Sequence, residues 1–270
     1  MTLDRLRLNG KVAIVTGGGT GLGKAMALAL ADAGADIVVS ARREGPIEAT
    51  VELVAAKGRR ALAIKTDVTS SAQVDTMVEK TVAEFGKVDI LVNNAGGGGG
   101  AVRGKTLFDI TDEDWRVGID TNLTGAFYCS RSAASHMIRQ GSGTIINIAS
   151  GHGMRGAPNS FMYNAAKAGT ILLTKSLALT LVGDNIRVHC IVPGFVAQTD
   201  PETDEDWQRL RERGRFVPVG RIGYAAEMGP LAVLLASDGA SYTTGQSFVL
   251  DGGGLQGAIA PVQLVPTVPI

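Results

Sequence analysis

The chain has 270 residues, of which 45% are hydrophobic, and its 26 lysines and arginines balance its 26 aspartates and glutamates. This length suits a single large α/β domain, and the balanced charge argues against a nucleic-acid-binding surface or an acidic docking tail. No stretch approaches the apolar length that spans a membrane, and the first eleven residues lack the apolar core of a secretory signal.

The cysteines and histidines give no sign of a metal centre. Cys129 and Cys190 are the only cysteines, and both lie in segments flanked by apolar residues. We therefore expect two buried thiols in a reducing cytoplasm, with neither a disulfide nor a metal site. The three histidines lack ligand spacing, although His152 could line a pocket as an alternative to facing solvent.

Short β-branched runs alternate with longer amphipathic segments along the whole chain. The expected strands span residues 12–15, 37–40, 61–66, 90–93, 144–149, 187–192 and 247–250. The expected helices lie near residues 22–33, 46–57, 71–85, 112–139, 161–182 and 225–236. This alternation predicts an α/β fold: a Rossmann-type, doubly wound parallel sheet of about seven strands, with helices on both faces, in a single domain.

A glycine-rich loop, Thr16-Gly-Gly-Gly-Thr-Gly-Leu-Gly23, joins the first expected strand to the first expected helix. Gly17 permits a tight turn, Gly21 lets the backbone approach a diphosphate, and Gly23 lets the helix pack on the strand. The N–H groups at the start of the helix would then face the phosphates. The residues predicted to bind a dinucleotide here are Gly17, Gly19, Thr20, Gly21, Leu22 and Gly23.

The end of the second expected strand bears on the choice of dinucleotide. An acidic residue there would bind the ribose 2′-hydroxyl of NAD, whereas a basic residue would accommodate the 2′-phosphate of NADP. No acid is present in this stretch, Arg42 and Arg43 follow the strand, and Ser40 can donate a further hydrogen bond. These residues favour NADP(H) over NAD(H), unless both arginines are simply solvated.

Tyr163 and Lys167 lie four residues apart in the expected helix 161–182, so their side chains share one face of it. A free tyrosine keeps its proton until about pH 10, and an adjacent ammonium group would stabilise its phenolate. Ser150 lies thirteen residues before Tyr163 and can hydrogen-bond a reacting oxygen. A phosphate-binding loop and a proton-exchanging tyrosine together predict nicotinamide redox chemistry.

Together these residues resemble the short-chain dehydrogenase/reductase family, from about residue 8 to residue 254. The motifs that carry the resemblance follow the family's order: the loop 16–23, Asp67-Val68, Asn93-Asn-Ala-Gly96, Asn122, Ser150, Tyr163-x-x-x-Lys167, Pro193-Gly194, and Thr244-Gly-Gln before Asp251-Gly-Gly. Any one of these motifs is a weak signal, whereas the ordered set is specific.

The resemblance implies a catalytic set of Asn122, Ser150, Tyr163 and Lys167. Ser150 would stabilise negative charge on the substrate oxygen, and Tyr163 would exchange the proton with it. Lys167 would lower the pKa of the tyrosine and hold the hydroxyls of the nicotinamide ribose. Asn122 would position a water that links the lysine to bulk solvent.

The resemblance also implies contacts to the cofactor outside the glycine loop. Asp67 would meet the adenine amino group, Val68 would supply a backbone contact, and Val196 would contact the nicotinamide carboxamide through its backbone. The further predicted cofactor residues are Asn94, Ala95, Gly96, Tyr163, Lys167, Pro193 and Gly194. Asn93 resembles the residue that ties neighbouring strands together.

The chain departs from the family pattern at three positions. Gln198 stands where the pattern has a threonine, which puts a threonine contact to the cofactor in doubt. Thr180 replaces a common glutamate and His189 replaces a common asparagine, and neither position belongs to the predicted reactive set.

Two segments do not fit the alternation of strands and helices. Residues 194–222 are polar and follow the end of a strand, so they are predicted to form a loop or lid over a site. Alternating arginines within 209–215 are expected on a solvated face, with an anionic substrate tail as the minority interpretation. Residues 1–254 are predicted to form one dinucleotide-binding and catalytic domain. The apolar tail 255–270 contains three prolines, and it is expected either to pack on a neighbouring subunit or to be disordered.

The leading hypothesis is an NADP(H)-dependent oxidoreductase that interconverts a small-molecule carbonyl and a secondary alcohol. A first alternative is an NADPH-dependent enoyl-thioester reductase, which the presence of Ser150 disfavours. A second is a non-catalytic nucleotide-binding regulator, which the complete reactive set disfavours. We expect no nucleic-acid or membrane partner and a cytoplasmic location, and the resemblance implies a homotetramer.

Overall fold

Seven apolar, β-branched runs form the seven parallel strands of a single sheet in this computed structural model, which describes residues 3–97 and 105–257. The strands are β1 (Val12–Thr16), β2 (Asp36–Ala41), β3 (Ala61–Lys65), β4 (Ile90–Asn93), β5 (Gly143–Ile148), β6 (Ile186–Pro193) and β7 (Ser247–Leu250). Their order in the sheet is β3-β2-β1-β4-β5-β6-β7, and every neighbouring pair is parallel. The predicted fold class is confirmed.

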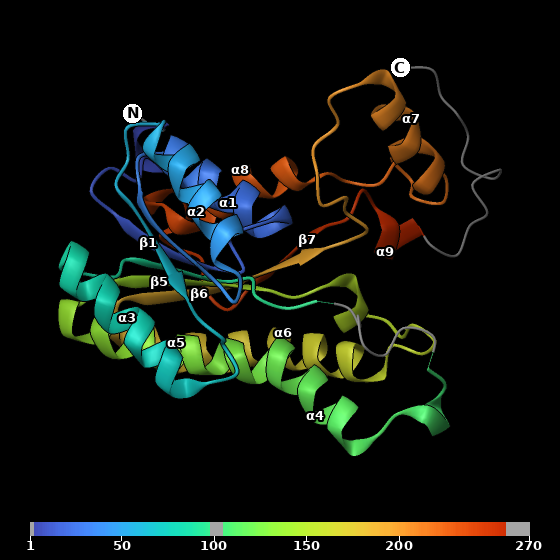
Figure 1. Ribbon diagram of the computed structural model, residues 1–270, viewed down its shortest axis with the longest axis horizontal. Coiled ribbons are helices and arrows are strands. Elements are labelled where there is room, and N and C mark those ends of the chain that lie inside the picture. The colour runs from blue at the N-terminus through green and yellow to red at the C-terminus, as the bar shows by residue number, and fades with distance from the viewer. Residues whose placement is uncertain (1–2, 98–104, 258–270) are drawn as a thin grey trace.

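Helices cover both faces of the sheet. They are α1 (Gly21–Asp32), α2 (Glu44–Ala55), α3 (Ser71–Phe85), α4 (Asp112–Ile119), α5 (Gly125–Gln140), α6 (Phe161–Leu181), α7 (Asp204–Arg213), α8 (Met228–Ala236) and α9 (Gly254–Gly257). Figure 1 shows α1, α2 and α8 on one face, and α3, α5 and α6 on the other. Successive side chains of a strand point to opposite faces, so Val15 packs in the core under α1 whereas Ile14 packs in the core under α3.

The direction of the strand order changes between β1 and β4, because β2 and β3 lie on one side of β1 and the remaining strands lie on the other. In open α/β sheets a crevice forms at the carboxyl ends of the strands at this point. The glycine loop leaves β1 there and residues 94–97 leave β4 there. The topology therefore brings two predicted site segments together, although 73 residues separate the two strands.

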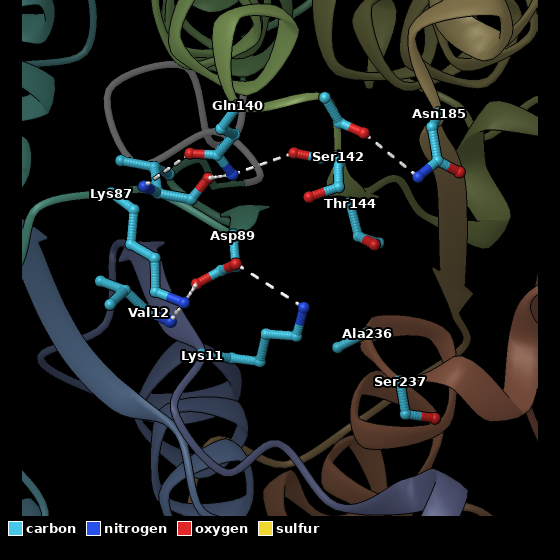
Figure 2. A network of polar contacts seen from close by, with 12 residues as sticks. Lys11, Val12, Lys87, Asp89, Gln140, Ser142, Thr144, Asn185, Ala236 and Ser237 are labelled. Carbon is cyan, nitrogen blue, oxygen red and sulfur yellow. Dashed lines mark hydrogen bonds and ion pairs between the residues drawn. The ribbon is translucent and has the colours of Figure 1, made fainter.

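The opposite end of the sheet is held by a polar network (Figure 2). Asp89, immediately before β4, accepts a hydrogen bond from the Val12 N–H at 2.8 Å and forms ion pairs with Lys87 at 3.0 Å and Lys11 at 3.7 Å. The Gln140 amide donates to the Val88 carbonyl oxygen at 2.8 Å. These contacts fix the amino ends of the strands, away from the crevice, so they stabilise the fold and take no part in the predicted site.

The expected single helix 112–139 is interrupted by a π-helical turn at Asp120–Thr124, between α4 and α5. The Asn122 side chain lies inside this turn and donates to the carbonyl oxygen of Gly118, four residues earlier, at 3.0 Å. In a regular α-helix the Gly118 carbonyl oxygen would accept from the backbone N–H four residues later. The Asn122 side chain competes for this oxygen, which explains the wider turn.

The polar segment 194–222 contains a helix and is not a loop throughout. Thr203 and Asp206 form a reciprocal capping box that starts α7. Leu210 of α7 packs with Ala197 and Ile222 in a small buried cluster that is separate from the two main cores. Arg209, Arg211, Arg213 and Arg215 are all exposed, as expected for a solvated face.

The longest helix corrects one expectation from the sequence. Residues Phe161–Asp184 are long and apolar enough to cross a membrane by length and composition, so the expectation that no stretch approaches this length is wrong. Within the described residues this helix packs on β6 and α4 and buries Lys167.

The predicted burial of Cys129 and Cys190 is confirmed, and both thiols are free. Most of the tail 255–270 lies outside the described residues.

Candidate active site

A cavity of about 1360 Å³ occupies the crevice at the carboxyl ends of the strands. It runs from Arg42 and Arg43, beyond the end of β2, to Ser150, beyond the end of β5, and Tyr163 on α6. All four predicted catalytic residues line this cavity: Asn122, Ser150, Tyr163 and Lys167. The predicted cofactor residues that line it are Gly17, Gly19, Thr20, Leu22, Gly23, Arg42, Arg43, Asp67, Val68, Asn94, Ala95, Gly96, Tyr163, Lys167, Pro193, Gly194 and Val196.

Two predicted cofactor residues, Ser40 and Gly21, do not line the cavity. Ser40 is fully buried in β2, and its hydroxyl has no hydrogen-bond partner among the described residues. Because side chains alternate along a strand, Ala41 reaches the cavity instead, and the predicted Ser40 contact is wrong. Gly21 is covered, because the Gln198 side chain lies over it.

The glycine loop requires glycine at Gly17 and Gly23 for different reasons. Gly17 has a φ of +64°, in the left-handed region that favours glycine. A Cβ on Gly23 would overlap the Gly17 carbonyl oxygen, so only glycine allows α1 to pack this closely on the loop. Thr20, the N-cap residue of α1, makes no side-chain capping bond among the described residues. The first-turn N–H groups are therefore free for an anionic ligand.

Asn94 holds the glycine loop against the end of β4. Its amide donates to the carbonyl oxygens of Thr16 at 3.0 Å and Gly17 at 3.2 Å. The Thr16 hydroxyl donates to Val92 O at 3.2 Å and accepts from the Ala95 N–H at 3.0 Å. Two segments that would both face the cofactor are thus joined into one rigid wall.

Asn93 ties strands and helices together beneath the cavity, as the resemblance implied. Its amide donates to Asn147 Oδ1 on β5 and to Ser130 Oγ on α5, both at 2.8 Å. Asn147 in turn donates to Thr174 Oγ1 on α6 at 2.9 Å. Asn147, Ser130 and Thr174 continue this buried chain, and no motif or spacing in the sequence marks them.

Lys167 and Tyr163 approach each other on α6, and both face the cavity. The Lys167 Nζ lies 5.6 Å from the centroid of the Tyr163 ring and donates to the Ile148 carbonyl oxygen at 2.9 Å. Lys167 is only 4% exposed, and burial lowers the pKa of its ammonium group to about 8.

The pKa of Tyr163 is raised in the ligand-free chain, opposite to the direction expected from the Tyr–Lys pair. Burial of the phenol causes the rise, and a hydrogen bond with Ser150 partly offsets it. In the ligand-free chain, the loss of hydration destabilises the phenolate more than the hydrogen bond with Ser150 stabilises it. A lowered tyrosine pKa therefore requires further positive charge next to the ring.

Asn122 binds the backbone that follows β4. Its Oδ1 accepts from the Gly97 N–H at 2.9 Å, and its amide donates to the Gly97 carbonyl oxygen at 3.2 Å. Its own carbonyl oxygen accepts from the Thr170 hydroxyl at 3.3 Å. The π turn thus places a buried amide between the cavity wall and α6.

His152 contacts the reactive residues, a position that the sequence left open. Its ring packs edge-on against the Tyr163 ring, with centroids 5.7 Å apart at 76°. Its backbone N–H donates to Ser150 Oγ at 3.2 Å. The ring is half-buried, and burial lowers its pKa. The Ser150 hydroxyl accepts this bond and donates to the Tyr163 oxygen, the hydrogen bond that opposes the rise in the tyrosine pKa.

The geometry fits a dinucleotide. The cavity is long, the free helix N-terminus lies at its middle, two arginines lie at one end, and the serine, tyrosine and lysine lie at the other. This order matches adenosine phosphate, diphosphate and nicotinamide in sequence along the crevice.

Comparisons with known proteins agree with this arrangement. A family model described as short chain dehydrogenase matches residues 11–209. The chain is 40% identical over 248 residues to a 3-oxoacyl-[acyl-carrier-protein] reductase from Synechocystis, covering 91% of this chain and 97% of that protein. It is also 40% identical over 258 residues to a 2-dehydro-3-deoxy-D-gluconate 5-dehydrogenase from Escherichia coli, covering 94% and 99%. A solved short-chain type dehydrogenase/reductase from Mycobacterium marinum aligns with a TM-score of 0.84 at 36% identity, covering 97% and 100%.

Proposed function

This chain belongs to the short-chain dehydrogenase/reductase family and is an NAD(P)-dependent oxidoreductase that interconverts CH–OH and C=O groups; we propose that it prefers NADP(H) and uses Tyr163 to exchange the substrate proton. The observation that carries the proposal is the convergence of Ser150, Tyr163 and Lys167 on one end of a cavity whose middle is a free helix N-terminus.

The proposed mechanism assigns one task to each reactive residue. The bound nicotinamide supplies hydride transfer at its ring. Ser150 donates a hydrogen bond to the substrate oxygen and keeps its proton, and Tyr163 transfers its own proton to that oxygen during reduction. Lys167 is mostly protonated at pH 7, since its pKa is about 8, and its charge stabilises the resulting phenolate. Asn122 holds the adjoining backbone and orients a water toward the lysine.

The proposed preference for NADP(H) rests on charge at the end of β2. Arg42 and Arg43 are exposed and line the cavity. The nearest following acid, Glu44, lies 3.6 Å from the Lys65 Nζ, so its charge is partly balanced. An exposed pair of arginines suits a 2′-phosphate better than a 2′-hydroxyl.

The substrate is proposed to be a small molecule with a ketone or secondary alcohol. The relatives described above include a reductase named for 3-oxoacyl thioesters and a dehydrogenase named for a sugar acid, so both classes belong in a screen. Ser150 supports carbonyl chemistry over reduction of an enoyl double bond, because its hydroxyl stabilises a developing alkoxide. We further propose that residues 194–222 act as a lid over this substrate.

A homotetramer in the cytoplasm is the proposed state of the enzyme. Exposed apolar side chains on α5 and α6 support association through this surface: Phe127, Ile138, Leu172 and Leu179. Burying them between subunits removes apolar area from water, which favours assembly.

The test is the consumption of NADPH and of NADH, measured by absorbance, with a panel of 3-oxoacyl thioesters, keto sugar acids and simple ketones. We expect faster turnover with NADPH on at least one carbonyl. Tyr163→Phe should lower that turnover by at least about 1,000-fold and leave cofactor affinity within about twofold. If the variant keeps most of the activity, Tyr163 is not the proton donor. If the dinucleotide binds but no substrate in the panel reacts, the regulator hypothesis replaces the enzyme.

A further inference from the structure

Gln198 is held above the glycine loop by anchors on both sides of it in the chain. On one side the Ala197 N–H donates to the Gly223 carbonyl oxygen at 2.8 Å, and Ala197 is buried in the small cluster with Leu210. On the other side Asp200 Oδ1 accepts a hydrogen bond from the Ala226 N–H at 2.7 Å. The backbone that carries Gln198 is therefore anchored on both sides.

The Gln198 side chain reaches across the crevice to the start of α1. Its amide oxygen lies so close to Gly21 that a Cβ there would overlap it. Gly21 begins the helix whose N-cap, Thr20, gives no side-chain capping bond among the described residues. A helix N-terminus carries partial positive charge, so the amide oxygen lies where an anionic oxygen would be attracted.

This position coincides with the middle of the cavity. Gln198 lines the cavity together with Gly19 and Leu22 of the loop and Val196 of its own segment. The arginines at one end and Tyr163 at the other leave this middle region for the part of a dinucleotide between adenosine and nicotinamide. That part is the diphosphate.

We propose that Gln198 binds the diphosphate of the cofactor, in place of the threonine that the family pattern has at this position. A glutamine amide carries two N–H donors as well as an acceptor oxygen. In the ligand-free chain the oxygen faces the helix N-terminus. When the diphosphate takes that place, the amide turns its N–H groups toward a phosphate oxygen, a charge-assisted hydrogen bond. NAD and NADP share the diphosphate, so the inference rests on dinucleotide binding and not on the proposed preference for NADP.

The rival explanation is that Gln198 is a plug that the diphosphate must displace. The two explanations predict opposite signs. A ligating Gln198 strengthens cofactor binding, so its removal weakens binding. A plug competes with the cofactor, so its removal strengthens binding.

The experiment measures dissociation constants by calorimetric or fluorescence titration of the ligand-free protein. The probes are NADPH, NADH, ADP-ribose, which keeps the diphosphate without nicotinamide, and AMP, which lacks the diphosphate. The variants are Gln198→Ala, and Gln198→Met, which keeps the length of the side chain without its donors. Gln208→Ala is the matched control, because Gln208 is an exposed amide on α7 bonded to Glu212.

We expect both Gln198 variants to raise the dissociation constants of the tighter dinucleotide and of ADP-ribose by about 10- to 100-fold, the range for a hydrogen bond to a charged group. AMP affinity should stay within about twofold, and Gln208→Ala should bind all probes as the parent protein does. Unchanged thermal melting of the ligand-free variants would confirm that they are folded.

Several outcomes would overturn the inference. Tighter dinucleotide binding by Gln198→Ala would establish the plug. Unchanged ADP-ribose binding would show that the amide makes no useful contact, and an equal loss for AMP would show that the effect is not specific to the diphosphate. If the parent protein binds neither NADPH nor NADH, the proposed function fails together with this inference. If the parent protein binds either dinucleotide, the variants test the role of Gln198 independently of the proposed function.

Discussion

The burial of Lys167 predicts how the stability of the ligand-free enzyme depends on pH. The pKa of this lysine falls from 10.5 to about 8 on folding, because its ammonium group leaves water. Between these two values the unfolded chain holds a proton that the folded chain has released. The contribution of Lys167 to the free energy of unfolding therefore rises with pH across this window and is smallest below pH 8.

The size of the effect follows from the two pKa values. Each pH unit of separation corresponds to about 1.4 kcal/mol, so the full window is worth about 3 kcal/mol. Roughly 2 kcal/mol of this accrues between pH 7 and pH 9.5, below the range in which tyrosines ionise. In a domain of this size that corresponds to about 4 °C in melting temperature.

Lys167→Met removes the titrating group and should remove the rise. The substitution also deletes the hydrogen bond to the Ile148 carbonyl oxygen, a cost of about 1–3 kcal/mol that does not vary with pH. The informative quantity is therefore the change with pH of the difference between the two proteins. Relative to the variant, the parent should gain about 2 kcal/mol from pH 7 to pH 9.5.

Thermal and urea unfolding of both proteins without cofactor, at equal protein concentration, measures this difference. Lys175→Met is the matched control, since Lys175 is an exposed lysine on the same helix, and its curve should stay parallel to that of the parent. Parallel curves for the parent and Lys167→Met would refute the reasoning, because they would mean that Lys167 keeps an ordinary pKa in the folded chain.

Two further predictions concern the cavity wall. The double variant of Arg42→Ala and Arg43→Ala should raise the dissociation constant for NADPH by about 10-fold and change that for NADH by less than about twofold. Fluorescence titrations measure both constants. Equal changes for the two cofactors would show that the arginines do not bind the 2′-phosphate. Asn122→Ala should lower the free energy of unfolding by about 1–3 kcal/mol, because the Gly97 N–H and carbonyl oxygen both lose their partner. Asn122→Asp keeps the acceptor and should restore part of this loss in urea unfolding; no loss in either variant would contradict the role assigned to the amide.

The fold was predictable because its signals are local and repeated. Each strand is a short apolar run, and each connection is long enough to hold a helix, so the alternation predicts a parallel sheet without knowledge of any contact. The glycine loop was predictable for a similar reason. Gly17 is needed for a positive φ and Gly23 for close packing of α1 on the loop, and the spacing of the glycines alone predicts both positions.

The parts that were not predicted depend on contacts between distant segments. The phase of side chains along β2 buries Ser40 and leaves the half-buried Ala41 at the cavity, and the register with neighbouring strands sets that phase. The π turn arises because one side chain, Asn122, takes a backbone carbonyl. The contacts of His152 with Tyr163 and of Gln198 with Gly21 each join a loop residue to a residue at the start of a helix, so no periodicity in the sequence signals them.

The small cluster of Ala197, Leu210 and Ile222 holds its own apolar contacts apart from the two cores beneath the sheet. A segment built this way can detach as a unit while the sheet keeps its full packing. The free energy of opening that allows amide protons to exchange with heavy water should therefore be smaller for α7 than for β5 or β6. The same independence lets mutations reshape what enters the crevice without unsettling the platform that holds the dinucleotide.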